Sequence, residues 1–193
     1  MRVVFVDMDG VLCDFVGSAC RALGVERPDP WPAGVYDMVE VLGLKSMSEM
    51  WRACRPQHEF FAHLDWMPDG KAIWATVREL VDPARIFILS MPSHEPGSWS
   101  GKVQWVRRHL GGGQVARMVL CENKRLLSSA GSLLIDDRAE TVEKWGWEGA
   151  GEAVLVPRVH NTGTGNPVEV VRAALLAWRK HERVTSGLAG VRA

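Results

Sequence analysis

Two pairs of aspartates, each directly after an apolar segment, are the strongest chemical signal in this sequence. Asp7 and Asp9 follow the β-branched and aromatic run 2–6, and Asp136 and Asp137 end a second apolar run. Carboxylates this close repel one another unless a cation or a shared proton compensates. A single aspartate after a strand is often only a helix N-cap. Two pairs in the same context instead favour a functional site.

The context of these pairs predicts a metal site. The carboxyl ends of parallel strands meet at one edge of an α/β sheet, and ligands bind at that edge. The aspartates of both pairs are therefore expected to lie together, and so much negative charge needs a divalent cation. Hard oxygen ligands without a neighbouring His or Cys favour Mg²⁺.

Two further polar residues lie between the aspartate pairs in the chain. Ser90 follows a predicted strand, and its hydroxyl and the nearby backbone N–H groups could hold a phosphoryl oxygen. Lys124 precedes the second pair and could neutralise phosphate charge. Taken alone, the serine is typical of a turn and the lysine of a solvated surface. Their order between the two aspartate pairs makes them candidates for the same site.

The elements that would position these residues alternate between strands and helices. Amphipathic helices are predicted at 71–81, 102–110, 138–145 and 168–178. Strands are predicted at 2–6, 85–89, 118–121, 133–135 and 153–156. This alternation predicts an α/β fold in which helices flank a parallel sheet.

One segment, residues 15–66, interrupts the alternation. It is rich in proline, contains a predicted helix at 46–54 and has no convincing strand. We therefore expect a small helical cap at 15–66, inserted after the first strand into a core formed by 1–14 and 67–183. The last residues, 184–193, have little to bury and are expected to form a frayed tail.

The composition argues against several broad classes of protein. The 193 residues include 23 basic and 23 acidic side chains, so the formal net charge is zero. A binder of nucleic-acid polymers or membrane surfaces would carry a basic excess. The four cysteines form no CxxC pair, which argues against a zinc site and is typical of a reducing compartment. No segment has the pattern of a signal peptide or a membrane span, so we expect a cytoplasmic protein.

The order of the four signals resembles the haloacid dehalogenase-like (HAD) phosphatase superfamily, whose motifs occur in that order. Within it, the segments DMDGVLCDF (7–15), GKVQWV (101–106) and LLIDDR (133–138) resemble the 5'(3')-deoxyribonucleotidase family. The resemblance implies a HAD-type Rossmann-like sheet with a small helical cap after the first strand. It also implies hydrolysis of nucleoside 5'-monophosphates, with a preference for deoxyribonucleotides.

The resemblance further implies roles for the aspartates. Asp7 would be the nucleophile that forms an aspartyl-phosphate, and Asp9 would be the general acid and base. Mg²⁺ would be bound by Asp7, the backbone carbonyl of Asp9, and Asp137. Asp136 would be a further metal ligand or an anchor for the others.

The other site residues would bind the substrate. Ser90, Lys124 and Lys102 would hold the phosphate, although Lys102 is equally consistent with an ordinary helix surface. Phe15 and Trp51 in the cap would form an aromatic slot for the base.

The insert holds three more ring-bearing residues that could contribute to that slot. Trp31 is a further candidate, whereas Tyr36 and His58 are interpreted as structural. Histidines elsewhere in the chain belong to no nucleophile arrangement, and a GxSxG turn is missing from the sequence. A Ser–His–Asp hydrolase is therefore not supported.

Other functions stay open on the sequence alone. The same motifs occur in phosphatases of sugar phosphates or other small phosphomonoesters, which a polar cap would favour, and a phosphomutase is also compatible. A non-catalytic nucleotide-binding module is disfavoured because all four motifs are present. We expect a small-molecule substrate rather than a nucleic-acid polymer. Related enzymes are often dimers, so a homodimer is compatible with the resemblance.

Overall fold

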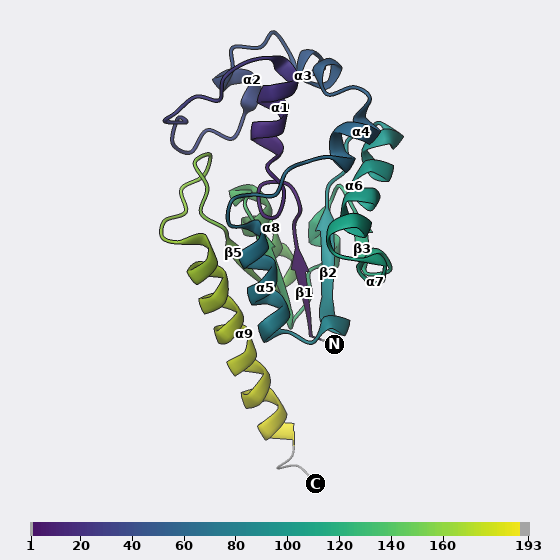
Figure 1. Ribbon diagram of the computed structural model, residues 1–193. Helices are drawn as coiled ribbons and strands as arrows, with labels where there is room; N and C mark the ends of the chain where they lie inside the picture. The colour runs from purple at the N-terminus through teal and green to yellow at the C-terminus, as the bar shows by residue number, and fades with distance from the viewer. Residues whose placement is uncertain (1, 190–193) are drawn as a thin grey trace.

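The structure is a computed structural model that describes residues 2–189 (Figure 1). Its centre is a five-stranded sheet in the order β3-β2-β1-β4-β5, and all neighbouring strands are parallel. The strands are β1 (Val3–Val6), β2 (Ile86–Ser90), β3 (Met118–Leu120), β4 (Ser132–Asp136) and β5 (Glu152–Leu155). All five predicted strands are present, and the parallel α/β fold is confirmed. Because β1 is the middle strand, the first aspartate motif leaves the centre of the sheet.

Helices cover both faces of this sheet, as its alternating apolar side chains require. The flanking elements are α5 (Gly70–Leu80), α6 (Pro96–His109), α7 (Gly112–Val115), α8 (Ala139–Gly149) and α9 (Pro167–Ala189), with the 3-10 turns η1 (Pro83–Arg85) and η2 (Lys124–Leu127). Val4 and Val6 join one apolar cluster with residues of α5, α6 and α9, whereas Phe5 packs edge-on against Trp145 of α8 on the other face.

Two helix boundaries differ from the prediction. α6 begins at Pro96 rather than at 102, because proline fits the first turn of a helix. α9 extends past 183 to Ala189, so the predicted frayed tail 184–193 is helical over its first part, where no proline interrupts it. The last four residues of that tail lie outside the described residues. No helix within residues 2–189 combines the length and apolar composition that a bilayer span requires.

The insert after β1 is helical, and its two connections to the core run side by side. The Asp14 N–H donates to Asp65 O at 2.9 Å, and the Met67 N–H donates to Leu12 O at 2.8 Å. Between these connections lie α1 (Phe15–Leu23), α2 (Met38–Val41), α3 (Met47–Ala53) and α4 (Gln57–Ala62).

The helices α1, α2 and α3 form the outer part of the insert, at the top of Figure 1. They surround a small apolar core of Ala19, Cys20, Trp31, Met38, Met50 and Cys54. Trp31 is only 5% exposed, and its Nε1–H donates to Val35 O at 2.7 Å. The expectation that Trp31 lines a ligand slot is therefore wrong, because its ring fills the interior of the insert.

The fourth helix, α4, packs against α6 of the core instead. A Cβ at Gly101 would lie 2.5 Å from His58 O, so only glycine allows the two backbones to approach this closely. On the same face of α6, Trp105 Nε1–H donates to Leu64 O at 2.8 Å. α4 is thus packed into the body that carries the sheet, although it belongs to the predicted cap.

Candidate active site

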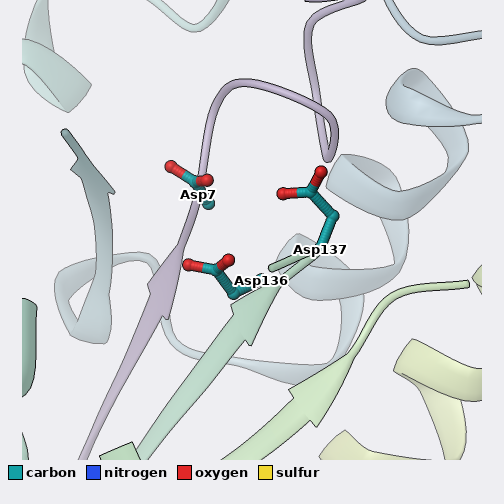
Figure 2. Close-up of side chains that lie close together, drawn as sticks. All are labelled: Asp7, Asp136 and Asp137. Carbon is teal, nitrogen blue, oxygen red and sulfur yellow. The ribbon is translucent and has the colours of Figure 1, made fainter. Parts of the chain in front are cut away.

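Three buried aspartates converge at the carboxyl edge of the sheet. Figure 2 shows Asp7 after β1, with Asp136 and Asp137 at the end of β4. One oxygen from each of the three carboxylates lies within 4.8 Å of the others. The register explains this convergence, because Val6 pairs with Ile135 directly before the two motifs.

Lys124 lies between two of these carboxylates. Its Nζ is 2.8 Å from Asp7 Oδ1 and donates to Asp136 Oδ2, also at 2.8 Å. The side chain is buried on η2, which follows β3. Burial lowers the pKa of Lys124, but the two carboxylates more than offset this and raise it above its ordinary value. Lys124 is therefore a permanently charged, fixed cation beside Asp7.

One cation does not balance the negative charge around Asp7. Burial raises the pKa of Asp7 to about 8, because Lys124 only partly opposes the shift and the neighbouring aspartates add to it. Burial also raises the pKa of Asp137, against the hydrogen bond from His160. A divalent cation would compensate the negative charge that makes ionisation of these carboxyl groups unfavourable, and carboxylate oxygens are ligands that it prefers. The carboxylates of Asp7, Asp136 and Asp137 therefore fit Mg²⁺.

Asp9 contacts a second buried lysine and does not belong to the three-carboxylate cluster. Its Oδ2 pairs with Lys102 Nζ, and the same Nζ donates to Ser90 Oγ at 2.8 Å. Lys102 is fully buried on α6, with its Nζ 4.8 Å from the centre of the Phe61 ring on α4. Asp9 Oδ1 is buried and has no hydrogen-bond partner within residues 2–189. Such an oxygen is available to hold a proton for a reacting group.

The two aspartates of the second pair are held differently. Asp136 accepts from Lys124 through Oδ2 and from the Arg138 N–H through Oδ1, at 2.9 Å, so both of its oxygens are engaged. The Asp137 carboxylate is hydrogen-bonded through Oδ2, which lies 2.7 Å from His160 Nε2. This difference suits Asp136 as an anchor and Asp137 as a direct cation ligand.

The loop after β1 depends on a glycine and on an arginine. Gly10 has a φ of +77°, and a Cβ there would lie 1.9 Å from Asp137 Oδ2. Arg158 donates to Gly10 O, to Val11 O at 3.3 Å and to both carboxylate oxygens of Asp69 at 2.8 and 2.9 Å. The loop that carries Asp9 is therefore clamped against the second aspartate pair.

We expect Gly10→Ala to displace Asp137 and to lower both stability and activity. A non-glycine residue in the left-handed region costs about 1–2 kcal/mol, and the clash adds about 1–3 kcal/mol. Gly24→Ala is the matched control, because Gly24 is also in the left-handed region, with a φ of +69°, but a Cβ there would have open space around it. Thermal unfolding in EDTA and phosphate release measure the two effects. Equal melting temperatures for the two variants would contradict the predicted clash.

A cavity of about 420 Å³ opens over Asp7 and Asp9. Tyr36, from the insert, forms part of its wall and is half-exposed. The Tyr36 ring lies edge-on to His160 at 5.4 Å, and the Arg138 guanidinium is 5.1 Å from its centre. Tyr36, interpreted from the sequence as structural, therefore lies at the site, where it bridges the insert and the core.

Phe15 and Trp51 lie in an aromatic cluster beside this cavity rather than in its wall. Their ring centres are 6.0 Å apart, and Phe15 also packs edge-on against Phe60 at 5.7 Å and stacks with Phe61 at 6.0 Å. The cluster reaches the candidate site through Phe61, whose ring is contacted by Lys102 Nζ. The slot predicted for Phe15 and Trp51 stays a prediction, because Phe15 also lines a second cavity of about 390 Å³ together with Arg158 and His160.

Comparisons with known proteins identify the family. The family model described as "5' nucleotidase, deoxy (Pyrimidine), cytosolic type C protein" matches residues 1–177. A human protein named "5'(3')-deoxyribonucleotidase, cytosolic type" is 31% identical over 192 residues, which cover 93% of this chain and 90% of the human one. The chain belongs to the 5'(3')-deoxyribonucleotidase family. It is therefore an enzyme of the 5'-nucleotidase type, a phosphatase.

Two further comparisons concern the family and the fold, respectively. A Vibrio phage KVP40 protein named "Putative 5'(3')-deoxyribonucleotidase" is 33% identical over 151 residues, 78% of this chain and 70% of the phage protein. A structure titled "Crystal structure of putative beta-phosphoglucomutase from Thermotoga maritima" has a TM-score of 0.50 and 16% identity, and covers 90% of this chain and 98% of its own. The second comparison concerns the fold alone, which is of the HAD type.

In this deoxyribonucleotidase-family chain, most residues singled out from the sequence lie together. Those at the carboxyl edge of the sheet are Asp7, Asp9, Ser90, Lys102, Lys124, Asp136 and Asp137. Sequence reasoning missed Tyr36, Arg158 and His160 as neighbours of the site. Only a weak signal could have found the last two: they follow the predicted strand 153–156, whose end reaches the same edge.

Proposed function

We propose that this chain is a Mg²⁺-dependent phosphomonoesterase that hydrolyses nucleoside 5'-monophosphates, deoxyribonucleotides in particular, through an aspartyl-phosphate. One observation carries the proposal: the buried Asp7 carboxylate lies beside the fixed Lys124 and two further aspartates, under an open cavity. The substrate class is taken from the names of the relatives.

In the first step, one oxygen of Asp7 attacks the phosphorus of the substrate. A bond forms from Asp7 to phosphorus while the bond from phosphorus to the ribose oxygen breaks. Asp9, in its protonated form, gives a proton to that leaving oxygen, so that the nucleoside departs as an alcohol. The unpartnered Oδ1 of Asp9 supports this role.

In the second step, a water molecule attacks the phosphorus of the aspartyl-phosphate. Asp9, now a carboxylate, takes a proton from this water as the new oxygen–phosphorus bond forms. The bond from phosphorus to Asp7 breaks, inorganic phosphate leaves, and both aspartates return to their starting states. Asp9 therefore serves once as an acid and once as a base.

Ser90, Lys102 and Lys124 would bind the oxygens of the transferred phosphoryl group. Lys102 now contacts both Asp9 and Ser90. When a phosphate arrives, Lys102 Nζ would turn to the phosphoryl oxygens and release Asp9 for proton transfer. Positioned cations of this kind stabilise the charge that develops on those oxygens.

Magnesium would be held by Asp7, the backbone carbonyl of Asp9, and Asp137. Asp136 serves as an anchor in this scheme, since both of its oxygens already accept hydrogen bonds. When bound, Mg²⁺ neutralises charge on the phosphoryl oxygens and on the surrounding carboxylates.

The base would contact aromatic side chains of the insert. Tyr36 lines the cavity over the carboxylates, and Phe15 and Trp51 belong to the neighbouring aromatic cluster. Aromatic faces stack on any nucleobase, whereas a sugar phosphate has no base to stack. A phosphatase of sugar phosphates remains the alternative, with the same chemistry at Asp7.

The direct test is phosphate release from a panel of nucleoside monophosphates and sugar phosphates, each with Mg²⁺ and with EDTA. Release that requires Mg²⁺ and is fastest with a deoxynucleoside 5'-monophosphate is the expected result. Faster release from a sugar phosphate would overturn the substrate class but not the chemistry. Unchanged release in EDTA would overturn the metal dependence.

We expect the affinity for Mg²⁺ to fall as the pH is lowered. Burial raises the pKa of Asp7 to about 8, so this carboxyl is protonated in the metal-free protein below that pH, and a bound cation must displace the proton. The dissociation constant should therefore increase by up to about tenfold per unit between about pH 8 and about pH 6. Calorimetric titration checks this, with Asp7→Asn as the control that should weaken the dependence to what Asp137 contributes, since burial also raises the pKa of Asp137. A constant affinity over this range would contradict the prediction.

We also infer a cytosolic location and a substrate that is a small molecule. The human relative's name includes "cytosolic type", which supports the location. Fractionation of cells that express the protein tests it. The compatible homodimer is tested by light scattering of the purified chain.

A further inference from the structure

His160 contacts the site from a loop that the proposed reaction does not use. It follows β5, is 6% exposed, and its Nε2 lies 2.7 Å from Asp137 Oδ2. A carboxylate can only accept a hydrogen bond, so the imidazole donates from Nε2. The next residue, Asn161, donates from Nδ2 to Asp137 O at 2.7 Å and to Val156 O at 2.9 Å. The side chain and the backbone of Asp137 are thus both held by this loop.

Contacts around His160 and Asp137 restrict the carboxylate further. Gly10 leaves no room beside Asp137 Oδ2, because a Cβ there would lie 1.9 Å from that oxygen. The Tyr36 ring packs edge-on against the His160 ring, with centres 5.4 Å apart. Asn161 is itself fixed, since its Oδ1 accepts from the N–H of Gly163 at 2.9 Å. The imidazole therefore lies in a rigid setting between the insert and Asp137.

We propose that His160 is a positioning residue that holds Asp137 Oδ2 and thereby presents Oδ1 to the divalent cation. This inference rests on the proposed metal site. Charge compensation alone is a weaker explanation, because Lys124 already supplies a buried cation to the cluster. Without the imidazole, Asp137 Oδ2 would lose this hydrogen bond, and cation binding would have to fix a less ordered carboxylate. Partners of metal ligands typically contribute about 10- to 100-fold to metal affinity.

The test is calorimetric titration of the purified protein with Mg²⁺, without substrate. His160→Leu keeps apolar bulk but removes the donor, and we expect it to weaken binding by about 10- to 100-fold. His160→Gln keeps an N–H donor at similar reach and should stay within about threefold of the wild type. His63→Ala is the matched control, because the His63 side chain is exposed at the end of α4 and its ring hydrogen-bonds the local backbone oxygen of Glu59.

A kinetic measurement separates positioning from a general structural defect. With increasing Mg²⁺, the activity of His160→Leu should recover, so the midpoint for Mg²⁺ rises far more than kcat falls. A fall in kcat that saturating Mg²⁺ does not reverse would contradict positioning. If His160→Leu does not fold, the comparison of His160→Gln with His160→Asn tests the positioning role instead. The asparagine side chain is too short to reach Asp137, so His160→Asn should bind Mg²⁺ more weakly than His160→Gln.

The outcomes also distinguish this inference from the proposed function. If the wild type does not bind Mg²⁺, the proposed metal dependence is wrong and the role of His160 falls with it. If the wild type binds Mg²⁺ and His160→Leu binds it equally well, only the positioning role is overturned. Equal affinities for His160→Gln and His160→Asn would overturn that role as well.

Discussion

Asp7→Asn should abolish phosphate release, with kcat lower by at least about 10⁴-fold. An amide cannot attack phosphorus. The other carboxylates that the structure describes around Asp7 are already engaged, because Asp9 pairs with Lys102, Asp136 with Lys124 and the backbone, and Asp137 with His160. Steady-state release of phosphate from the best substrate, at saturating Mg²⁺, measures the effect. A residual rate within about tenfold of wild type, in protein shown by mass to be free of deamidation, would contradict the covalent scheme.

The stability of the same variant shows whether the loss is chemical or structural. Because burial raises the pKa of Asp7 to about 8, ionisation of this group is unfavourable in the folded, metal-free protein. The contribution of Asp7 to the free energy of unfolding therefore decreases as the pH rises from the pKa of Asp7 in the unfolded chain toward about 8. Over this range the folded state holds a proton that the unfolded state has lost. At a pH above about 8, in EDTA, Asp7→Asn should melt at the same or a higher temperature than the wild type. Asp82→Asn is the control, because Asp82 is an exposed cap of η1 far from the cluster in sequence, and asparagine caps as well.

Lys124→Met should cause the second-largest effect, on both stability and activity. The substitution keeps much of the side-chain length but leaves Asp7 and Asp136 without their buried cation. Removal of one partner from a buried ion pair costs about 3–5 kcal/mol. Loss of a group that stabilises charge on the phosphoryl oxygens costs a further factor of about 10²–10³ in kcat.

Thermal unfolding of Lys124→Met, with and without Mg²⁺, checks the electrostatic origin of this effect. The melting temperature should fall sharply in EDTA and recover in part with Mg²⁺, since the cation takes over some of the missing charge. The added substitution Asp136→Asn should also restore stability, because one of the two unpaired carboxylates is removed. Lys45→Met, at an exposed lysine of the insert, is the matched control. No recovery in either case would contradict the charge-balance explanation.

The five strands and the convergence of the aspartates could be predicted from the sequence. Runs such as 2–6 and 133–135 are apolar and β-branched, and only buried parallel strands accommodate several of them with helices between. Once these runs are strands, the topology itself brings Asp7 and Asp137 to one edge. The observed register, with Val6 opposite Ile135, follows that rule. The aspartates are local in this sense, because each pair needs only to follow its own strand.

The contacts that surround these groups depend on segments distant in the sequence, and periodicity carries no information about them. Arg158 hydrogen-bonds Gly10 O across 148 positions, and His160 reaches Asp137 from a loop without a motif of its own. Nothing in the sequence distinguishes Tyr36 from an aromatic residue with a purely structural role. The fold of the insert nevertheless places it against His160 in the cavity wall.

The insert likewise has features that follow from the sequence and features that depend on packing. Its position between β1 and α5 follows from the break in alternation, and its helical character from the helix predicted at 46–54 and the lack of a strand pattern. Which of its rings face ligand and which face each other depends on packing. Trp31 fills the interior, and Phe15 and Trp51 pack together, because each apolar ring lowers its free energy wherever it leaves water. Sequence alone thus determined the sheet and the chemistry at its edge, and only tertiary packing decided what encloses them, because apolar burial is non-directional.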